Sequence, residues 1–244
     1  MKLSFSRSTI GTDILFVVLC IVYFGFDTPD GSSPLALHCS IGDIAAAPWQ
    51  LLTYSLTHTG LIHLLVNLIV LVVGGSLLEK STSTLRMFAV YAAGAIAGAV
   101  VFAATCVAVG VDDATLSGSS AAVLAVCAAW LGQLPEASSM IKSNPRIRLA
   151  VIVVLLIAVA GVTGDNPGGS LAHIGGIVTG WLLGRYFANN RAAASDMSDL
   201  SDKPDPSSDI LAKAERSGFA SLSADERRRL FKSSNPSRNG SKQQ

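Results

Sequence analysis

Six apolar runs divide the first 187 residues of this chain, and short polar segments separate them. An α-helix needs about 20 apolar residues to cross a bilayer, where no water can satisfy an unpaired backbone group. The expected spans are Thr9–Phe26, Leu61–Leu78, Met87–Val107, Ser120–Leu134, Leu149–Thr163 and Leu171–Tyr186. The last three are short, which implies bilayer thinning or protein-lined helix ends. The sequence therefore predicts an all-α polytopic membrane protein with six transmembrane helices.

The charged residues are concentrated in the C-terminal part of the chain. Only 14% of all residues are charged, against about 25% in a typical soluble domain. Residues 188–244 nevertheless hold 10 of the 18 Lys and Arg and 8 of the 17 Asp and Glu. We expect a membrane domain over residues 1–187, a flexible linker over 188–208, a small helical hairpin over 209–234 and disorder over 235–244.

The basic residues of the membrane domain all fall on one side of the predicted spans. All eight lie before the first span, in the second and fourth connections or at the end of the sixth span: Lys2, Arg7, Lys80, Arg86, Lys142, Arg146, Arg148 and Arg185. The other three connections contain Asp but no Lys or Arg. Because Lys and Arg in short loops collect on the cytoplasmic side, both termini are predicted to be cytoplasmic. No cleavage site follows the first span, which we expect to be retained.

Four polar residues lie at the outer ends of three predicted spans. His63 and Asn67 begin the second span and share one helix face, Ser120 begins the fourth, and His173 begins the sixth. An unpaired polar group in hydrocarbon costs several kcal/mol, so these groups are expected to pair with one another. A Ser paired with a His indicates a nucleophile and its base.

Small residues offer a reason for the fourth and sixth spans to meet. Stripes of Gly and Ala let membrane helices approach closely. They are Ala121, Ala125, Ala128 and Gly132 on the fourth span, and Gly176, Gly180 and Gly184 on the sixth. Such stripes also occur in helix bundles that catalyse nothing.

Three blocks of this chain resemble the hallmark blocks of the rhomboid intramembrane serine proteases, in the same order and spacing. They are Trp49–Glu79, Gly118–Ala121 and Ala172–Gly184. The resemblance covers residues 9–187 and implies a bacterial-type rhomboid with a six-span core and a cytoplasmic tail. It further implies a multi-pass protein of an inner or plasma membrane that cleaves single-span membrane proteins near the outer face of the bilayer.

The resemblance also implies a role for each polar residue. Ser120 would be the nucleophile and His173 its general base, while His63, Asn67 and the Ser120 N–H would form the oxyanion hole. Gly118 would let the backbone turn ahead of Ser120. Ala121, Gly176 and Gly180 would be structural residues near the site. No cofactor, metal or nucleic-acid partner is expected, and the oligomeric state is left open.

Three positions depart from the rhomboid pattern. Ala121 replaces the usual Gly after the nucleophile, Leu124 replaces a frequent aromatic residue, and Gln50 replaces a common Arg. The departure at Ala121 leaves a second hypothesis open, in which a catalytically inactive rhomboid-like protein binds or escorts membrane clients.

Several residues near the predicted site have competing interpretations. Ser117 and Ser119 are rivals to Ser120, with Ser119 expected to cap the incoming helix. His58 is expected to make structural hydrogen bonds in the first loop. Asp165 is the one nearby carboxylate that could orient His173. The four cysteines suggest no disulfide framework.

Overall fold

The computed structural model describes residues 9–27, 33–134, 137–145, 148, 152, 167–201 and 206–233. The chain forms two compact units, Met1–Asn189 and Asn190–Gln244. The helices of the first unit are α1 (Ile10–Phe26), α2 (Ile41–Ala46), α3 (Gln50–Thr53), η1 (Tyr54–Leu56), α4 (Leu61–Ser81), α5 (Thr84–Val109), α6 (Ser120–Gly132), α7 (Ala137–Ser143) and α9, which begins in it (Pro167–Ser201). Those of the second are α10 (Pro206–Ser217), η2 (Phe219–Ser221) and α11 (Ala224–Ser233).

Helices occur at five of the six positions where spans were expected. Within the described residues, α4 and α5 are long and apolar enough to cross a bilayer, and α1 and α6 are shorter apolar helices. The expected span over 149–163 lies outside the described residues. The first unit is thus built from apolar helices, in agreement with the predicted fold class.

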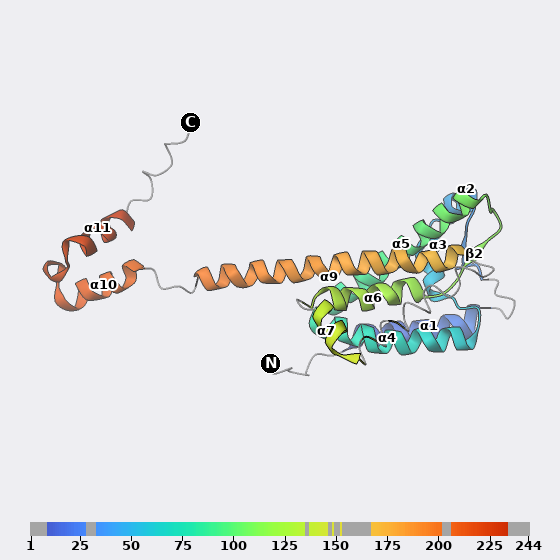
Figure 1. The fold of residues 1–244 in the computed structure, drawn as a ribbon, viewed down its shortest axis with the longest axis horizontal. Coiled ribbons are helices and arrows are strands. Elements are labelled where there is room, and N and C mark those ends of the chain that lie inside the picture. The colour runs from blue at the N-terminus through green and yellow to red at the C-terminus, as the bar shows by residue number, and fades with distance from the viewer. Residues whose placement is uncertain are drawn as a thin grey trace, which may run out of the picture. The chain divides into compact units, whose positions relative to one another are not determined.

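Helix α6 lies at the centre of the first unit, between α4 and α5. Figure 1 shows α4, α6 and the first part of α9 running side by side. Every residue from Ala121 to Val126 is buried. Glycines let the neighbouring helices come this close: a methyl on Gly74 of α4 would collide with the Cys127 thiol, and one on Gly94 of α5 would collide with the Ala125 methyl.

A short antiparallel ladder joins two loops at one end of this unit. Strand β1 (Leu37–His38) pairs with β2 (Thr115–Leu116), with Leu37 opposite Leu116. The all-α prediction did not include this pair, because two-residue strands leave too short a pattern to read. The ladder fixes the first loop to the segment that leads into α6.

A buried carboxylate at the other end of the unit holds α1 against α4. Glu79 near the end of α4 accepts hydrogen bonds from the backbone N–H groups of Gly11 and Thr12, at 2.8 and 2.9 Å. The hydroxyls of Thr12 and Thr84 donate to the same carboxylate, at 2.8 and 2.6 Å. Glu79 therefore satisfies the free donors at the start of α1, where a negative charge is also favoured.

Helix α9 continues beyond the expected end of the sixth span. It runs to Ser201, so the first part of the region expected to be a flexible linker is helical. The segment Arg191–Ala194 consists of strong helix formers, and the first proline after it is Pro204. Helix propensity therefore decides the structure at the start of this region, although its polar composition indicated a linker.

The second unit contains the helices α10 and α11, which η2 connects. Gly218 ends α10 with a φ of 80°, which an L-residue rarely adopts. Ser223 and Glu226 form a reciprocal capping box at the start of α11, and Lys213 binds Glu226 at 2.8 Å. Among its apolar residues, Ile210 and Leu222 are buried, whereas Leu211, Phe219 and Phe231 are exposed.

Replacing Glu79 by Gln tests the role of this carboxylate. The amide retains one acceptor oxygen for four donors, so we expect a loss of about 2 kcal/mol in the free energy of unfolding. Thermal unfolding of the full chain in detergent measures the loss. Asp112→Asn, which removes an exposed carboxylate, is the control and should leave the melting temperature unchanged. Equal melting temperatures for Glu79→Gln and the native protein would contradict the assignment.

Candidate active site

A loop with a left-handed glycine leads into α6. Gly118 has a φ of 127°, and Ser119 and Ser120 follow it as the N-cap and first residue of the helix. A methyl on Gly118 would lie 2.6 Å from Cε1 and 2.9 Å from Nε2 of His63. Position 118 therefore requires glycine for two reasons, the backbone angle and the space that the His63 ring occupies.

The side chains of Ser120 and His173 meet across the interface between α6 and α9. Ser120 Oγ lies 2.7 Å from His173 Nε2, a short distance for a hydroxyl–imidazole hydrogen bond. When the hydroxyl donates to Nε2, the ring carries its proton on Nδ1. The two residues are 53 positions apart in the sequence and belong to different helices. The structure thus brings together the two residues that the sequence suggested as a pair.

Three glycines of α9 set the distance across this interface. Methyl groups on Gly176, Gly180 and Gly184 would collide with the backbone carbonyl groups of Ala121, Ala125 and Ala129, respectively. Because the backbone of α6 lies directly against these positions, any side chain there would push α9 away. The same glycine-lined contact holds His173 against Ser120.

His63 lies beside the Ser120 loop, whereas Asn67 is turned partly toward its own helix. The ring of His63 contacts Gly118 and packs edge-on against His58, with 5.1 Å between ring centroids. Asn67 Nδ2 donates to the His63 carbonyl oxygen at 2.9 Å, which uses one of its two hydrogens. The role of both residues in an oxyanion hole remains a prediction.

Ser119 binds His58 in place of capping the helix. Its hydroxyl lies 3.1 Å from His58 Nε2, and its backbone N–H donates to the same nitrogen at 3.4 Å. The His58 backbone N–H in turn donates to Asp27 Oδ2 at 2.7 Å. Ser119 occupies the predicted N-cap position, but its side chain makes no cap bond. This contact with His58 distinguishes Ser119 from Ser120.

Burial keeps His58 neutral. The side chain is only 2% exposed, and its ring packs edge-on against His63 with 5.1 Å between centroids. Loss of hydration and the nearby His63 lower the pKa of His58 to about 3. A neutral His58 can accept both hydrogen bonds from Ser119, which a charged imidazolium cannot.

Ala121 fits because the residue opposite it on α5 is glycine. A methyl on Gly98 would lie 2.7 Å from the Ala121 methyl and 2.8 Å from Tyr54 Oη. Tyr54 Oη donates to the Ala95 carbonyl at 2.8 Å, and the Tyr54 carbonyl accepts the Gly118 N–H at 3.1 Å. The departure at position 121 is therefore accommodated without displacing the loop that carries Ser120.

Gln50 anchors the first loop despite the departure from the common Arg. Its side chain is buried, and Nε2 donates to the Pro34 carbonyl at 3.2 Å. The suggested orienting carboxylate, Asp165, lies outside the described residues.

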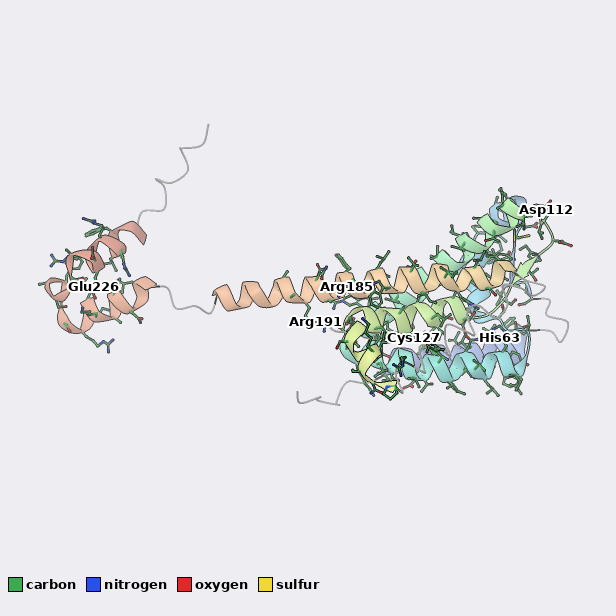
Figure 2. The ribbon with its side chains drawn as sticks, in the orientation of Figure 1. His63, Asp112, Cys127, Arg185, Arg191 and Glu226 are labelled. Atoms are coloured by element: carbon green, nitrogen blue, oxygen red, sulfur yellow. The ribbon has the colours of Figure 1, made fainter. Side chains whose placement is uncertain are left out.

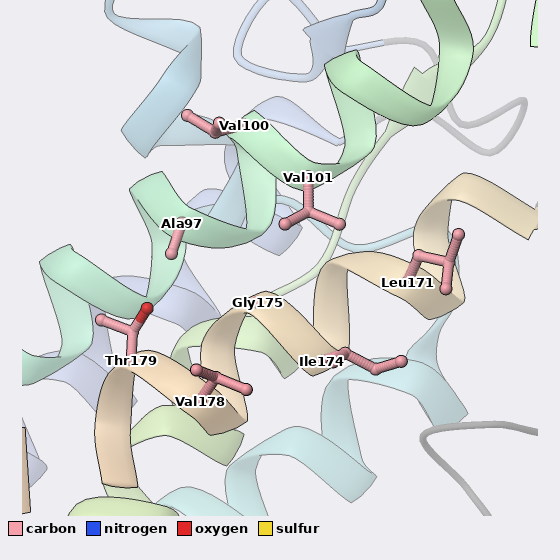
Figure 3. A pocket seen from close by; sticks show the side chains of 8 residues that line it. All are labelled: Ala97, Val100, Val101, Leu171, Ile174, Gly175, Val178 and Thr179. Carbon is pink, nitrogen blue, oxygen red and sulfur yellow. The ribbon is translucent and has the colours of Figure 1, made fainter. Parts of the chain in front are cut away.

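A separate apolar groove of about 500 Å³ lies between α5 and α9. Figure 3 shows its lining side chains, which come from these two helices. They are Ala97, Val100, Val101, Leu171, Ile174, Gly175, Val178 and Thr179. None of them can act as an acid, a base or a metal ligand. Across the described residues, no three His, Cys, Asp or Glu side chains gather at a metal-binding distance.

Comparison with known proteins identifies the family. The family model described as the rhomboid domain matches residues 45–190, which is more than half of the chain. This chain belongs to the rhomboid family. It is 30% identical over 140 residues to RHOMBOID-like protein 7 of Arabidopsis thaliana, covering 56% of this chain and 42% of that protein. It is also 30% identical over 161 residues to Rhomboid-related protein 3 of Homo sapiens, covering 60% and 38%.

These relatives are considerably longer than the region they share with this rhomboid. RHOMBOID-like protein 6, mitochondrial, of Arabidopsis thaliana is 28% identical over 137 residues, or 42% of its length. The chain thus spans less than half the length of the curated relatives it matches. The matched region contains Ser120, His173, His63 and Asn67.

The low pKa of His58 predicts how the stability of this rhomboid depends on pH. The unfolded imidazole has a pKa of about 6.5, so the unfolded state takes up a proton first as the pH falls. Stability should therefore be full above pH 7 and decrease toward pH 3, with about 2 kcal/mol lost by pH 5. Thermal unfolding between pH 7 and 5 measures the decrease. His58→Gln, which cannot titrate, should be less stable at pH 7 but show a smaller decrease; equal slopes would contradict the prediction.

Substituting Gly176 by Ala tests the close contact of α6 and α9. The added methyl collides with the Ala121 carbonyl, so we expect a loss of about 2 kcal/mol in the free energy of unfolding. Thermal unfolding measures it. Gly25→Ala is the matched control, because the space around Gly25 is open, and it should not lower the melting temperature. An equal effect of both substitutions would argue against the contact.

Proposed function

We propose that this rhomboid is an intramembrane serine endopeptidase that uses Ser120 and His173 as a catalytic dyad. The observation that carries the proposal is the 2.7 Å contact between Ser120 Oγ and His173 Nε2. Membership of the rhomboid family supports the same chemistry. A hydroxyl and a neutral imidazole in contact are the two groups needed to activate a serine for attack on a peptide carbonyl.

The reaction follows from these two groups. His173 Nε2 takes the proton of Ser120 as Oγ attacks the carbonyl carbon of the scissile peptide bond. The tetrahedral intermediate collapses when the imidazolium returns this proton to the leaving amine, which leaves an acyl group on Ser120. A water molecule, deprotonated by His173 in the same way, then releases the acyl group and regenerates the hydroxyl.

The negative oxygen of the intermediate requires hydrogen-bond donors. The Ser120 N–H lies at the N-terminus of α6, where the helix dipole favours negative charge. His63 contacts the loop just before Ser120, and Asn67 lies one turn further along the same helix. We propose that these three groups stabilise the oxyanion, a contribution worth about 100-fold to 1000-fold in turnover for each donor in comparable sites.

The charge distribution supports a site near the outer face of the membrane. Figure 2 shows Asp112 at the end of the first unit that holds the loops, and Arg185 toward the other end. Lys80 and Arg86 flank the turn between α4 and α5, opposite to the end where α6 begins. By the positive-inside rule, Ser120 faces the non-cytoplasmic side and both termini are cytoplasmic. We infer a six-span protein of an inner or plasma membrane whose substrates are single-span membrane proteins.

The alternative function, binding of membrane clients without catalysis, depended on Ala121. Compared with glycine, Ala121 adds one methyl at a tight contact between helices. It lies against Gly98, while the backbone carbonyl of Ala121 still lies against Gly176. This arrangement favours the peptidase over the inactive binding protein.

Labelling with a fluorophosphonate probe tests the proposed nucleophile. Such a probe forms a covalent bond with a serine only when a base activates it. In the full chain, solubilised in detergent, we expect the probe to label the native protein and Ser117→Ala. We expect it not to label Ser120→Ala or His173→Ala. Ser117→Ala is the matched control, since it removes a hydroxyl three residues from Ser120.

Two outcomes would contradict the proposal. One is labelling of Ser120→Ala at the native level, and the other is failure of a folded native protein to label. Melting temperatures of all four proteins establish that each is folded. Cleavage of a panel of single-span model substrates in liposomes, dependent on the same two residues, would then extend the result from reactivity to proteolysis.

A further inference from the structure

Two cysteines that are far apart in the sequence meet at the loop end of the first unit. Cys39 directly follows β1 in the first loop, and Cys106 lies in the last turn of α5. Cys39 Sγ donates to the Val111 carbonyl at 3.3 Å, and the Val111 N–H donates to the Cys106 carbonyl at 3.0 Å. The side chains of Cys39 and Cys106 also belong to the same cluster of buried core residues. Val111 and this shared core thus bring the two cysteines close to each other.

The surroundings of this cysteine pair are fixed. The Cys39 backbone N–H donates to the Ala114 carbonyl at 3.1 Å, which continues the ladder between β1 and β2. Both side chains belong to the core, with 1% of Cys39 and 4% of Cys106 exposed. The fold itself therefore holds the two cysteines near each other in a fixed part of the core.

The compartment that the pair faces favours oxidation. The first loop and the end of α5 belong to the side that carries Asp but no Lys or Arg, which the proposed orientation places outside the cytoplasm. Disulfides form and persist on that side of a cell membrane, whereas cytoplasmic thiols are kept reduced. The remaining cysteines, Cys20 and Cys127, lie within α1 and α6 and serve as internal controls.

We propose that Cys39 and Cys106 form a disulfide bond that ties the first loop to the outer end of α5. The two thiols lose two protons and two electrons to a disulfide-bearing oxidant of the outer compartment, which leaves as a dithiol. One thiolate attacks a sulfur of the oxidant to give a mixed disulfide, and the other thiolate displaces it. Because both sulfur atoms are buried in the folded protein, this exchange takes place before the first loop packs.

The bond would stabilise the segment that leads to Ser120. Strand β1 ends at His38, immediately before Cys39, and pairs with β2, which is followed by Ser117, Gly118 and Ser119. A covalent link at Cys39 would hold this ladder in place, and reduction would let the first loop separate from α5. The inference rests on the proposed orientation and does not depend on the proposed peptidase activity.

Counting the cysteines that are paired in the full chain tests the proposed disulfide bond. Membranes are denatured in sodium dodecyl sulfate in the presence of N-ethylmaleimide, which blocks every free thiol whether or not it was buried. The protein is then reduced and labelled with a polyethylene-glycol maleimide, which marks only the cysteines that were paired. We expect two labels on the native protein and two on the Cys20→Ser/Cys127→Ser double variant. Cys39→Ser should carry none. Absence of label on the native protein and on the double variant would overturn the proposal, and neither of these depends on how Cys39→Ser folds.

Thermal unfolding with and without a reductant tests the effect on the loop. Closing so long a loop typically stabilises a protein enough to raise its melting temperature by about 5 °C or more. We expect dithiothreitol to lower the melting temperature of the native protein and of Cys20→Ser/Cys127→Ser by this amount. Cys39→Ser/Cys106→Ser should melt at the same temperature with and without it. An unchanged native melting temperature after complete reduction would overturn the stabilising role.

Discussion

The approach of α9 to the backbone of α6 is the constraint on which the site depends. Gly176, Gly180 and Gly184 lie against carbonyl groups on successive turns of α6, where no side chain can be accommodated. In a membrane, such close packing replaces the hydrophobic force that joins helices in water. Ser120 and His173 stand at the outer end of this contact, 2.7 Å apart. The geometry of the proposed dyad is therefore a property of the helix interface more than of the two side chains.

A second set of contacts fixes the position of the Ser120 loop. Tyr54 accepts the Gly118 N–H through its carbonyl and binds α5 through its hydroxyl, while His58 binds Ser119 from the other side. These contacts come from the first loop, which the β1–β2 ladder also holds. The loop that carries Ser120 is thus supported by residues that precede α4 in the sequence.

The sequence predicted what depends on local pattern and missed what depends on long-range contacts. The starts of α4 and α6, the capping box of the tail and the facing of Ser120 with His173 could be anticipated, because each leaves a short pattern or a shared membrane depth. Glu79 looked like an ordinary charge at a helix end. Its partners in α1 lie 67 and 68 positions away, and no pattern in the neighbouring sequence indicates this contact.

The pairing of Ala121 with Gly98 has an evolutionary consequence. The extra methyl on α6 occupies space that a glycine on α5 leaves free, so the interface holds one methyl where two would collide. If position 121 were glycine, α5 could carry the methyl only after Tyr54 Oη, at 2.8 Å, and the Ala172 carbonyl oxygen, at 3.2 Å, had moved away. Among relatives, the identities of these two positions should then change together, and a residue that departs from a family pattern should be judged together with the residue opposite it.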